Sequence, residues 1–278
     1  MLFINTNIKK LQMKKLIIGF IALAITSSCN SSNDDISTPT NPTKVETVSV
    51  LPVTVKYVSN KSEFFATYSY SGDKINEIVG SDGRKLVYTY NGDNIIKEEF
   101  SVNGKSRFIK DFSYSNDKIM SIKYTNKTAS PEIIYTKNIQ YLDANHIKYD
   151  DFSVDGTPSL QYDLYYDNNW NETKREIRKI GSTGNPATTQ VSTFDNKNNP
   201  IKNIKGYVKI TRVDSTVGLG LLGYHNKGGN NNLLTTTDSV GILIEDKIDY
   251  NINSYPLSIM STNIFDNIGA KIEYSYNK

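Results

Sequence analysis

Histidine, cysteine and catalytic serine motifs, which carry much of enzyme chemistry, are scarce in this chain of 278 residues. The two histidines, His146 and His225, lie about eighty residues apart and have no metal-ligand spacing. No Gly-x-Ser-x-Gly elbow is present to expose a nucleophilic serine. The carboxylate pairs of glycoside hydrolases are defined in space, and no pair stands out in the sequence. We therefore predict that the chain is not an enzyme and holds neither a cofactor nor a metal ion.

Two short motifs imitate known ligand sites. Residues 218–223, GLGLLG, match the glycines of a dinucleotide fingerprint, which requires a strand before them and a helix after them. The run YHNKGG that follows cannot open such a helix. Asp167, Asn169 and Asn171 imitate the first half of an EF-hand calcium loop, but Glu172 stands where that loop requires glycine. We expect neither a nucleotide nor calcium at these positions.

Ser215 and Ser239 each follow an aspartate, in the runs DST and DSV. These runs resemble the three-residue O-glycosylation sites of exported Bacteroidota proteins. Both serines lie in a segment that we expect to be an accessible loop. The resemblance implies that they are modification sites.

The first 28 residues have the layout of a secretory signal peptide. Lys14 and Lys15 form a positively charged region, residues 16–25 form an apolar run of ten, and small polar residues follow. A run this short does not span a bilayer, which takes ~20 residues. Because residues 13–28 already make a complete leader, the true start is either Met1 or Met13.

The only cysteine, Cys29, stands directly after this leader. Residues 25–29, ITSSC, resemble a lipobox, the signal for acylation of the cysteine, with Thr26 in place of the usual leucine. A lone cysteine in an oxidising compartment otherwise lacks a partner, and acylation gives it a role. We predict that Cys29 carries the lipid that anchors the mature protein to a bilayer. An ordinary secreted protein with one free thiol is the alternative.

Removal of the leader also removes the apparent basic character of the chain. Four of the 32 basic residues lie in the leader, which leaves 28 against 29 acidic residues. A basic mature chain would have suggested nucleic acid as a partner. The balanced mature chain instead predicts no nucleic-acid binding.

Residues 29–44 are polar, contain two prolines, and cannot bury enough apolar surface to fold. We predict a flexible tether with a reach of roughly 20 Å. Asp34 and Asp35 resemble the acidic export signal that sends Bacteroidota-type lipoproteins to the outer face of the outer membrane. The alternative is that they only solvate the tether. We therefore expect an outer-membrane location and leave open which face the protein occupies.

A repeat runs through residues 45–278, which we predict to form one domain. Its clearest copies are YSYSGDKINEI at 68–78, YTYNGDNIIKE at 88–98 and FSYSNDKIMSI at 112–122. Weaker copies follow around Tyr141, Tyr166, Phe194, Tyr250 and Tyr276. Successive anchors are 20, 24, 27, 25, 28, 56 and 26 residues apart, and the interval of 56 marks an insertion near residues 206–240. Such spacings are typical of stacked supersecondary units.

Each copy has the pattern of a β-hairpin. Tyr68 and Tyr70 alternate with serine, which places both rings on one face of a strand. Gly72 and Asp73 suit a tight turn, and isoleucines lie on the returning strand. The repeats therefore predict an all-β fold. It would be a long antiparallel meander of hairpins, twisted and partly closed into a shell or barrel.

Three segments fall outside the repeat. Val45–Val58 is expected to pair with one edge of the sheet, because Pro52 suits an edge strand. Residues 173–180 are the best candidate for a short helix, and the insertion near 206–240 is expected to be a loop.

The repeated tyrosines allow two interpretations. Aromatic side chains on one strand face are usually cross-strand core partners, and we favour this over a sugar-stacking platform. Tyr165, out of phase with its neighbours, and Trp170, in an asparagine-rich turn, are the candidates for aromatic side chains that face a ligand.

The unit of Tyr-x-Tyr, a short Asn/Gly/Asp turn and a following isoleucine is similar to the YD repeats of Rhs-type bacterial shell proteins. It is more similar still to Bacteroidota lipoproteins that carry such repeats, as FDNKNNPIKNI at 194–204 and IEYSY at 272–276 illustrate. The resemblance covers most of residues 60–278 and implies an architecture rather than a chemistry. The sequence departs from Rhs proteins in lacking their long repeat array and an evident toxin domain.

These observations predict a membrane-anchored, surface-exposed lipoprotein that acts as a non-enzymatic binding module for a glycan or a protein. A structural envelope protein without a ligand is one alternative. A carbohydrate-active enzyme is the other, and it would require two carboxylates about 5–10 Å apart across a groove.

Overall fold

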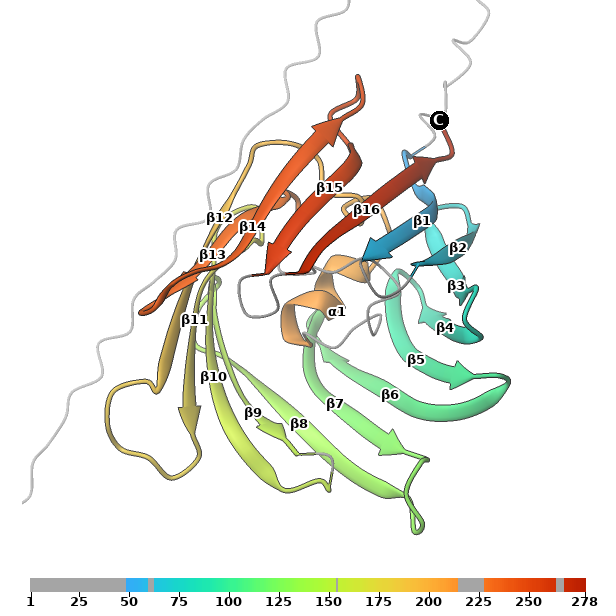
Figure 1. The fold of residues 1–278 in the computed structure, drawn as a ribbon. Helices are drawn as coiled ribbons and strands as arrows, with labels where there is room; N and C mark the ends of the chain where they lie inside the picture. The colour runs from blue at the N-terminus through green and yellow to red at the C-terminus, as the bar shows by residue number, and fades with distance from the viewer. Residues whose placement is uncertain (1–48, 60–62, 154, 215–227, 264–267) are drawn as a thin grey trace, which may run out of the picture. The chain divides into compact units, whose positions relative to one another are not determined.

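A computed structural model describes residues 49–59, 63–153, 155–214, 228–263 and 268–278 (Figure 1). These residues belong to one compact unit, Thr47–Lys278. The predicted leader, the tether with Cys29, Ser215, His225 and the GLGLLG run lie outside the described residues.

The described residues form sixteen β-strands and one α-helix. In chain order they are β1 (Pro52–Ser59), β2 (Glu63–Ser71), β3 (Lys74–Gly80), β4 (Arg84–Asn91), β5 (Asn94–Val102), β6 (Lys105–Ser115), β7 (Lys118–Asn126), β8 (Ile133–Tyr141), β9 (His146–Phe152), β10 (Pro158–Tyr166), β11 (Glu172–Lys179), β12 (Thr188–Phe194), α1 (Tyr207–Val213), β13 (Leu233–Asp238), β14 (Gly241–Tyr250), β15 (Pro256–Asn263) and β16 (Ile268–Tyr276). Among these elements there is no helix with the length and apolar character needed to cross a membrane.

Every strand pairs in antiparallel fashion with its neighbours in the sequence, and β1 also pairs with β16. The register of that closing pair runs from Pro52 opposite Tyr276 to Ser59 opposite Ala270. The meander is therefore a closed barrel, which confirms the predicted all-β fold and leaves the sheet without open edges. The segment expected to pair with the sheet does so through β1, but the edge position that Pro52 suggested is wrong, because β2 and β16 flank β1 on both sides. Pro52 is tolerated because it is the first residue of the strand, where its missing N–H is least needed.

The tight turns follow the repeat. Gly72 and Gly92 take positive φ values of 66° and 57°, and in the third copy Asn116 and Asp117 take 49° and 62°. Positive φ at these positions matches the twist of a hairpin, and glycine, asparagine and aspartate tolerate it best. The turn chemistry of the sequence therefore sets the hairpin geometry.

The second tyrosine of each Tyr-x-Tyr pair has its own structural role. The strand register shifts at Tyr70, Tyr90 and Tyr114, which marks a β-bulge that redirects the side chain. The hydroxyl of Tyr70 donates to the carbonyl of Pro52 (2.7 Å), and that of Tyr114 donates to the carbonyl of Ile95 (2.7 Å). Each of these bonds ties the end of one strand to its neighbour.

The inner face of the barrel is apolar and aromatic. The buried cluster includes isoleucines of the returning strands, such as Ile75 and Ile78, the first tyrosines of the first two repeats, Tyr68 and Tyr88, and Tyr149 of β9. Burial raises the pKa of these tyrosines well above its ordinary value. The tyrosine stripe is therefore core, as the cross-strand interpretation predicts.

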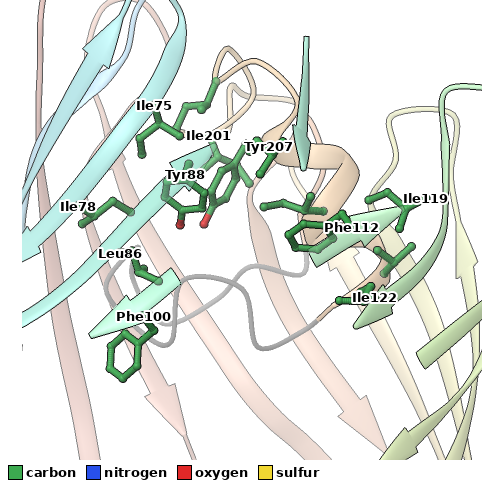
Figure 2. Packing of buried hydrophobic residues seen from close by; sticks show 14 of the residues in the cluster. Ile75, Ile78, Leu86, Tyr88, Phe100, Phe112, Ile119, Ile122, Ile201 and Tyr207 are labelled. Atoms are coloured by element: carbon green, nitrogen blue, oxygen red, sulfur yellow. The ribbon is translucent and has the colours of Figure 1, made fainter. Parts of the chain in front are cut away.

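Helix α1 lies inside the ring of strands and packs on this cluster (Figure 1). Tyr207 is fully buried, and its ring centroid lies 5.8 Å from that of Tyr88 in an edge-to-face arrangement (Figure 2). Gly206 precedes the helix with a φ of 73°, and a Cβ there would lie 2.7 Å from the carbonyl oxygen of Asp93. We call residues 195–213, which join β12 to the end of α1, the plug.

A buried ion cluster fixes the end of the plug. The Lys110 ammonium of β6 lies 2.9 Å from the Glu98 carboxylate of β5 and 2.8 Å from Asp214, which caps α1. Burial lowers the pKa of Lys110, but the two carboxylates more than offset that effect and raise it overall. Loss of one partner from such a cluster would leave an uncompensated buried charge.

The outer face of the barrel carries charged side chains in cross-strand and same-strand pairs. Lys85 lies 2.6 Å from Glu77, Lys174 lies 2.9 Å from Glu176, and Lys271 lies 2.6 Å from Glu273. Partly exposed pairs of this kind contribute about 0–1 kcal/mol each. A strand face against lipid would carry an apolar band instead. These charged positions therefore suit contact with water.

Two sequence-based predictions about local structure are wrong. Residues 173–180, expected to form a helix, lie mostly in β11. Side chains alternate between the two faces of this strand, and Arg175 and Ile177 face inward opposite Leu164 and Tyr162. The segment near 206–240, expected to be a loop, contains α1 and β13, although residues 215–227 lie outside the described part. The apolar residues of α1 form a stripe that the barrel interior covers.

Asp246 on β14 makes the stability of the barrel depend on pH. Its side chain is buried opposite Ser261, and burial raises its pKa from 3.8 to about 7, although a hydrogen bond with Ser261 opposes the rise. Between these two values the folded protein holds a proton that the unfolded chain releases. The free energy of unfolding therefore falls as pH rises from 4 to 8, by about 2–4 kcal/mol.

We expect Asp246→Asn to raise the free energy of unfolding by about 2–4 kcal/mol at pH 8 and to change it little at pH 4, measured by urea denaturation. Asp249→Asn is the matched control, because Asp249 lies exposed on the same strand. An equal effect of Asp246→Asn at both pH values would contradict the assignment.

Candidate functional site

The plug closes one end of the barrel by bonding to the turns around it. Its contacts reach four turns and the residues just before β1: Asn198 N–H to Ser254 O (2.9 Å), Asn203 Nδ2 to Val50 O (3.0 Å), Lys205 N–H to Asp73 O (2.9 Å), Lys209 Nζ to Asp117 Oδ1 (2.5 Å) and Arg212 Nη2 to Ala144 O (3.4 Å). We call this the plug end. It brings loops from distant parts of the sequence onto one surface, which is where binding residues usually lie.

The turn between β10 and β11 lies at the plug end and is stabilised by hydrogen bonds between its own residues. The Asp167 carboxylate accepts the N–H groups of Asn169 (2.8 Å) and Asn171 (3.0 Å). The buried Asn171 side chain in turn accepts the N–H groups of Gly229 (3.0 Å) and Asn231 (3.2 Å). The residues that imitate a calcium loop therefore form an Asx-type turn that anchors residues 228–231.

Trp170 occupies the strained position of this turn. Its φ is 65°, in the left-handed region that bulky residues rarely adopt, yet 39% of the residue remains exposed. The Arg212 guanidinium carbon lies 4.0 Å from the Trp170 ring centroid and 4.5 Å from that of Tyr166. A strained and exposed aromatic residue points to a function outside the core, because glycine or asparagine would fit the backbone better.

Two hollows share Trp170 and Lys209 in their linings. The first, about 290 Å³, is lined by Asp117, Lys118, Tyr141, Asn145, Asn168 and Arg212 among others. The second, about 390 Å³, is lined by residues of the plug that include Lys202, Asn203 and Lys205. We call the two hollows together the Trp170 groove. It combines one exposed aromatic ring with amide, carboxylate and cationic groups, which together offer both donors and acceptors to a polar ligand.

The polar groups of the groove are held in place by their neighbours. Lys209 Nζ donates to Asp117 and to Asn94 Oδ1 (2.9 Å), and Asn94 Nδ2 donates to Asp117 Oδ1 (3.1 Å). The two hydrogen bonds that Asp117 accepts, from Lys209 and from Asn94, lower the pKa of its carboxyl. The Tyr141 hydroxyl donates to the Ile119 carbonyl (3.1 Å), so its ring is fixed in the wall. Preorganised side chains bind with a smaller loss of conformational entropy.

Tyr165, the other predicted ligand-facing aromatic, lies away from the groove. It stands on the outer face of β10, where its ring stacks on His146 at 4.1 Å and lies 3.9 Å from Lys174 Nζ. His146 Nε2 is 3.1 Å from the buried Asp163 carboxylate, which also lies 3.8 Å from Arg178 Nε. Tyr165 and His146 therefore belong to a half-buried cluster of side chains on the barrel wall.

The closest grouping of carboxylates that the structure describes around one cation is Glu98 and Asp214 at Lys110. Both carboxylate residues are 1% exposed, so a polysaccharide has no access to them. A glycosidase pair must face a groove that admits the substrate. The cluster is therefore suited to hold the plug rather than to cleave a glycosidic bond.

Ser239 is exposed in the turn between β13 and β14, where the Asp238 carboxylate accepts the N–H of Val240 (2.8 Å). This position is accessible to a modifying enzyme, and glycosylation there stays a prediction, as does that of Ser215.

No protein-family model matches the chain, and no curated protein matches it. Among solved structures, a porin-like protein from Bacteroides uniformis is similar over 81% of this chain and 96% of its own, with 10% identity and a TM-score of 0.49. A porin-like protein from Bacteroides vulgatus is similar over 82% and 99%, with 10% identity and a TM-score of 0.35. The closed barrel is established by the strand pairing of this chain itself.

Sequence reasoning identified Trp170 from its place in an asparagine-rich turn but missed its partners. Lys209 and Arg212 come from the insertion, where no repeat gives their position. The spacing of Tyr207, Ile210 and Val213 is the signal that could have indicated a short helix in this segment, which the sequence alone predicts to be a loop.

We expect Trp170→Gly to change the free energy of unfolding by no more than about 1 kcal/mol. Relief of the left-handed backbone offsets the lost contact with Arg212, each worth about 1 kcal/mol. Trp170→Val cannot relieve the backbone and should be less stable than the glycine variant, as urea denaturation measures. Leu164→Ala, which empties a core position, is the positive control and should cost about 2–5 kcal/mol. A loss of that size in the glycine variant would mean that Trp170 is part of the core.

Proposed function

We propose that this protein is a lipid-anchored, non-enzymatic envelope protein that binds a glycan in the Trp170 groove. The observation that carries the proposal is the exposed Trp170 ring, held in a strained turn among fixed polar side chains. Sugars present apolar C–H faces and many hydroxyl groups. An aromatic ring flanked by amides and charged groups can meet both, because amides both donate and accept hydrogen bonds.

The filled interior supports a role at the barrel surface. Tyr88, Tyr149 and Tyr207 occupy the lumen, and the plug bonds to the turns at one end. Ligand recognition is therefore better placed in the loops than along the barrel axis. A protein bound in the same groove is the alternative ligand.

The envelope location in the proposal rests on the predicted leader and on Cys29. Two or more acyl chains would hold the mature protein stably on a membrane, whereas one chain gives only marginal binding. Replacement of Cys29 by alanine should move the protein from the membrane fraction to the soluble fraction of cells. Retention of this variant in the membrane fraction would count against lipid anchoring.

The full chain should bind a subset of glycans on an array, and Trp170→Ala should weaken that binding about 30-fold, the effect of losing a central aromatic contact. Tyr165→Ala is the matched control, an aromatic outside the groove that should leave affinity within about twofold. Equal losses in both variants would refute the groove as the site. A blank array together with a blank pull-down from envelope extracts would favour a structural role, which predicts an envelope defect on deletion.

A further inference from the structure

A separate cavity, of about 300 Å³, lies among β6, β7, β8 and β9, toward the end of the barrel opposite the plug. Asn126 and Phe152 end strands β7 and β9 there, and Phe108 lies near the start of β6. Tyr124, Tyr135 and Lys137 also line the cavity. This cavity shares no lining residue with the Trp170 groove.

One wall of the cavity is a row of stacked rings. The ring centroids of Tyr124 and Tyr135 lie 4.8 Å apart at 14°, and those of Tyr135 and Phe152 lie 4.8 Å apart at 28°. The rings come from three adjacent strands, and the register of β7 and β8 sets Tyr124 directly opposite Tyr135. A wall of this kind favours a flat apolar group in the cavity.

A buried cation stands beside that wall. Lys137 is only 2% exposed, and its ammonium lies 3.1 Å from the Asp151 carboxylate. Its other near neighbours are aromatic faces, with Tyr149 at 4.4 Å and Tyr124 at 5.3 Å. An ammonium has three N–H donors, and ring faces are weaker acceptors than a carboxylate. The Lys137 ammonium can therefore donate a further hydrogen bond to an oxygen atom of a ligand in the cavity.

Asp151, the ion-pair partner of Lys137, is placed so that a ligand can displace its carboxylate. The Asp151 side chain is 30% exposed, so its carboxylate can turn toward water without a large desolvation cost. Lys110, the other lysine in the lining, is already balanced by Glu98 and Asp214. A ligand carboxylate that replaces Asp151 would thus keep Lys137 paired and leave the charge of the interior unchanged.

We propose that this cavity binds a small aromatic carboxylate. The ligand's carboxylate takes the place of Asp151 on Lys137, and its ring lies against Tyr124, Tyr135 and Phe152. A cationic ligand of the same shape would meet the Lys137 ammonium at the same point and is disfavoured. This inference goes beyond the proposed glycan site and does not depend on it.

The test uses three probes of one shape that differ in charge: 3-phenylpropionate, 3-phenylpropanol and 3-phenylpropylamine. With the full chain, isothermal titration calorimetry should show the tightest binding for the carboxylate and the weakest for the amine. Tightest binding of the amine, or no binding of the carboxylate at millimolar concentration, would overturn the proposal.

Two variants assign the contacts. Lys137→Met should weaken carboxylate binding about tenfold or more, the effect of losing a hydrogen bond to a charged group, and should leave the alcohol within about twofold. Asp151→Asn should tighten carboxylate binding, because it removes the internal competitor and keeps the side-chain shape. Carboxylate binding that survives Lys137→Met, or that Asp151→Asn abolishes, would contradict the assignment.

Trp170→Ala separates this cavity from the glycan site. It should leave the affinity for 3-phenylpropionate unchanged, whatever the glycan array shows. A parallel loss of both ligands in this variant would mean that the carboxylate binds in the groove instead.

Discussion

Closure of the barrel by β1 and β16 is the constraint on which the rest of this structure depends. A barrel of about sixteen strands encloses a lumen wide enough to hold water unless something fills it. Here the strands turn tyrosine and isoleucine side chains inward, and the plug adds α1 to the interior. The buried Lys110 cluster then fixes the end of the plug against β5 and β6. A large closed sheet thus acquires a packed core that its strands alone would not supply.

The repeat solves a second problem, which is how so many hairpins keep one register. In the three clearest copies the first aromatic residue, Tyr68, Tyr88 or Phe112, packs in the core. A β-bulge then turns the second aromatic residue away from that position. In β8 the Tyr141 hydroxyl donates to the Ile119 carbonyl, and in β16 the Tyr276 hydroxyl donates to the Pro256 carbonyl. In β4 the Tyr90 hydroxyl donates to the Lys205 carbonyl, so the same device also holds the plug (3.0 Å). One residue type therefore contributes packing in one position and a hydrogen bond in the next.

The sequence predicted those features that depend on local chemistry. Strand and turn positions in the three clearest repeats were correct, because alternation and turn residues such as Gly72 act over a few positions. Closure was only partly expected, since nothing local marks β1 as the partner of a strand more than 200 residues later. The strand β11 was mistaken for a helix, because its many charged residues conceal the alternation. The Trp170 groove was found only through Trp170, because its other walls come from turns that the fold brings together.

A filled interior also determines where this protein can act. The Trp170 groove lies at the plug end of the barrel, and the cavity lined by Lys137 and Tyr124 lies toward the other end. Spectrophotometric titration of tyrosine ionisation tests the filled barrel most directly. Burial raises the pKa of Tyr68, Tyr88, Tyr124, Tyr149, Tyr166 and Tyr207 well above its ordinary value. We predict that these side chains stay protonated beyond pH ~11 and ionise only as the chain unfolds. Reversible ionisation of all 19 tyrosines in one transition near pH ~10 would show that the interior is open to water and would contradict this account.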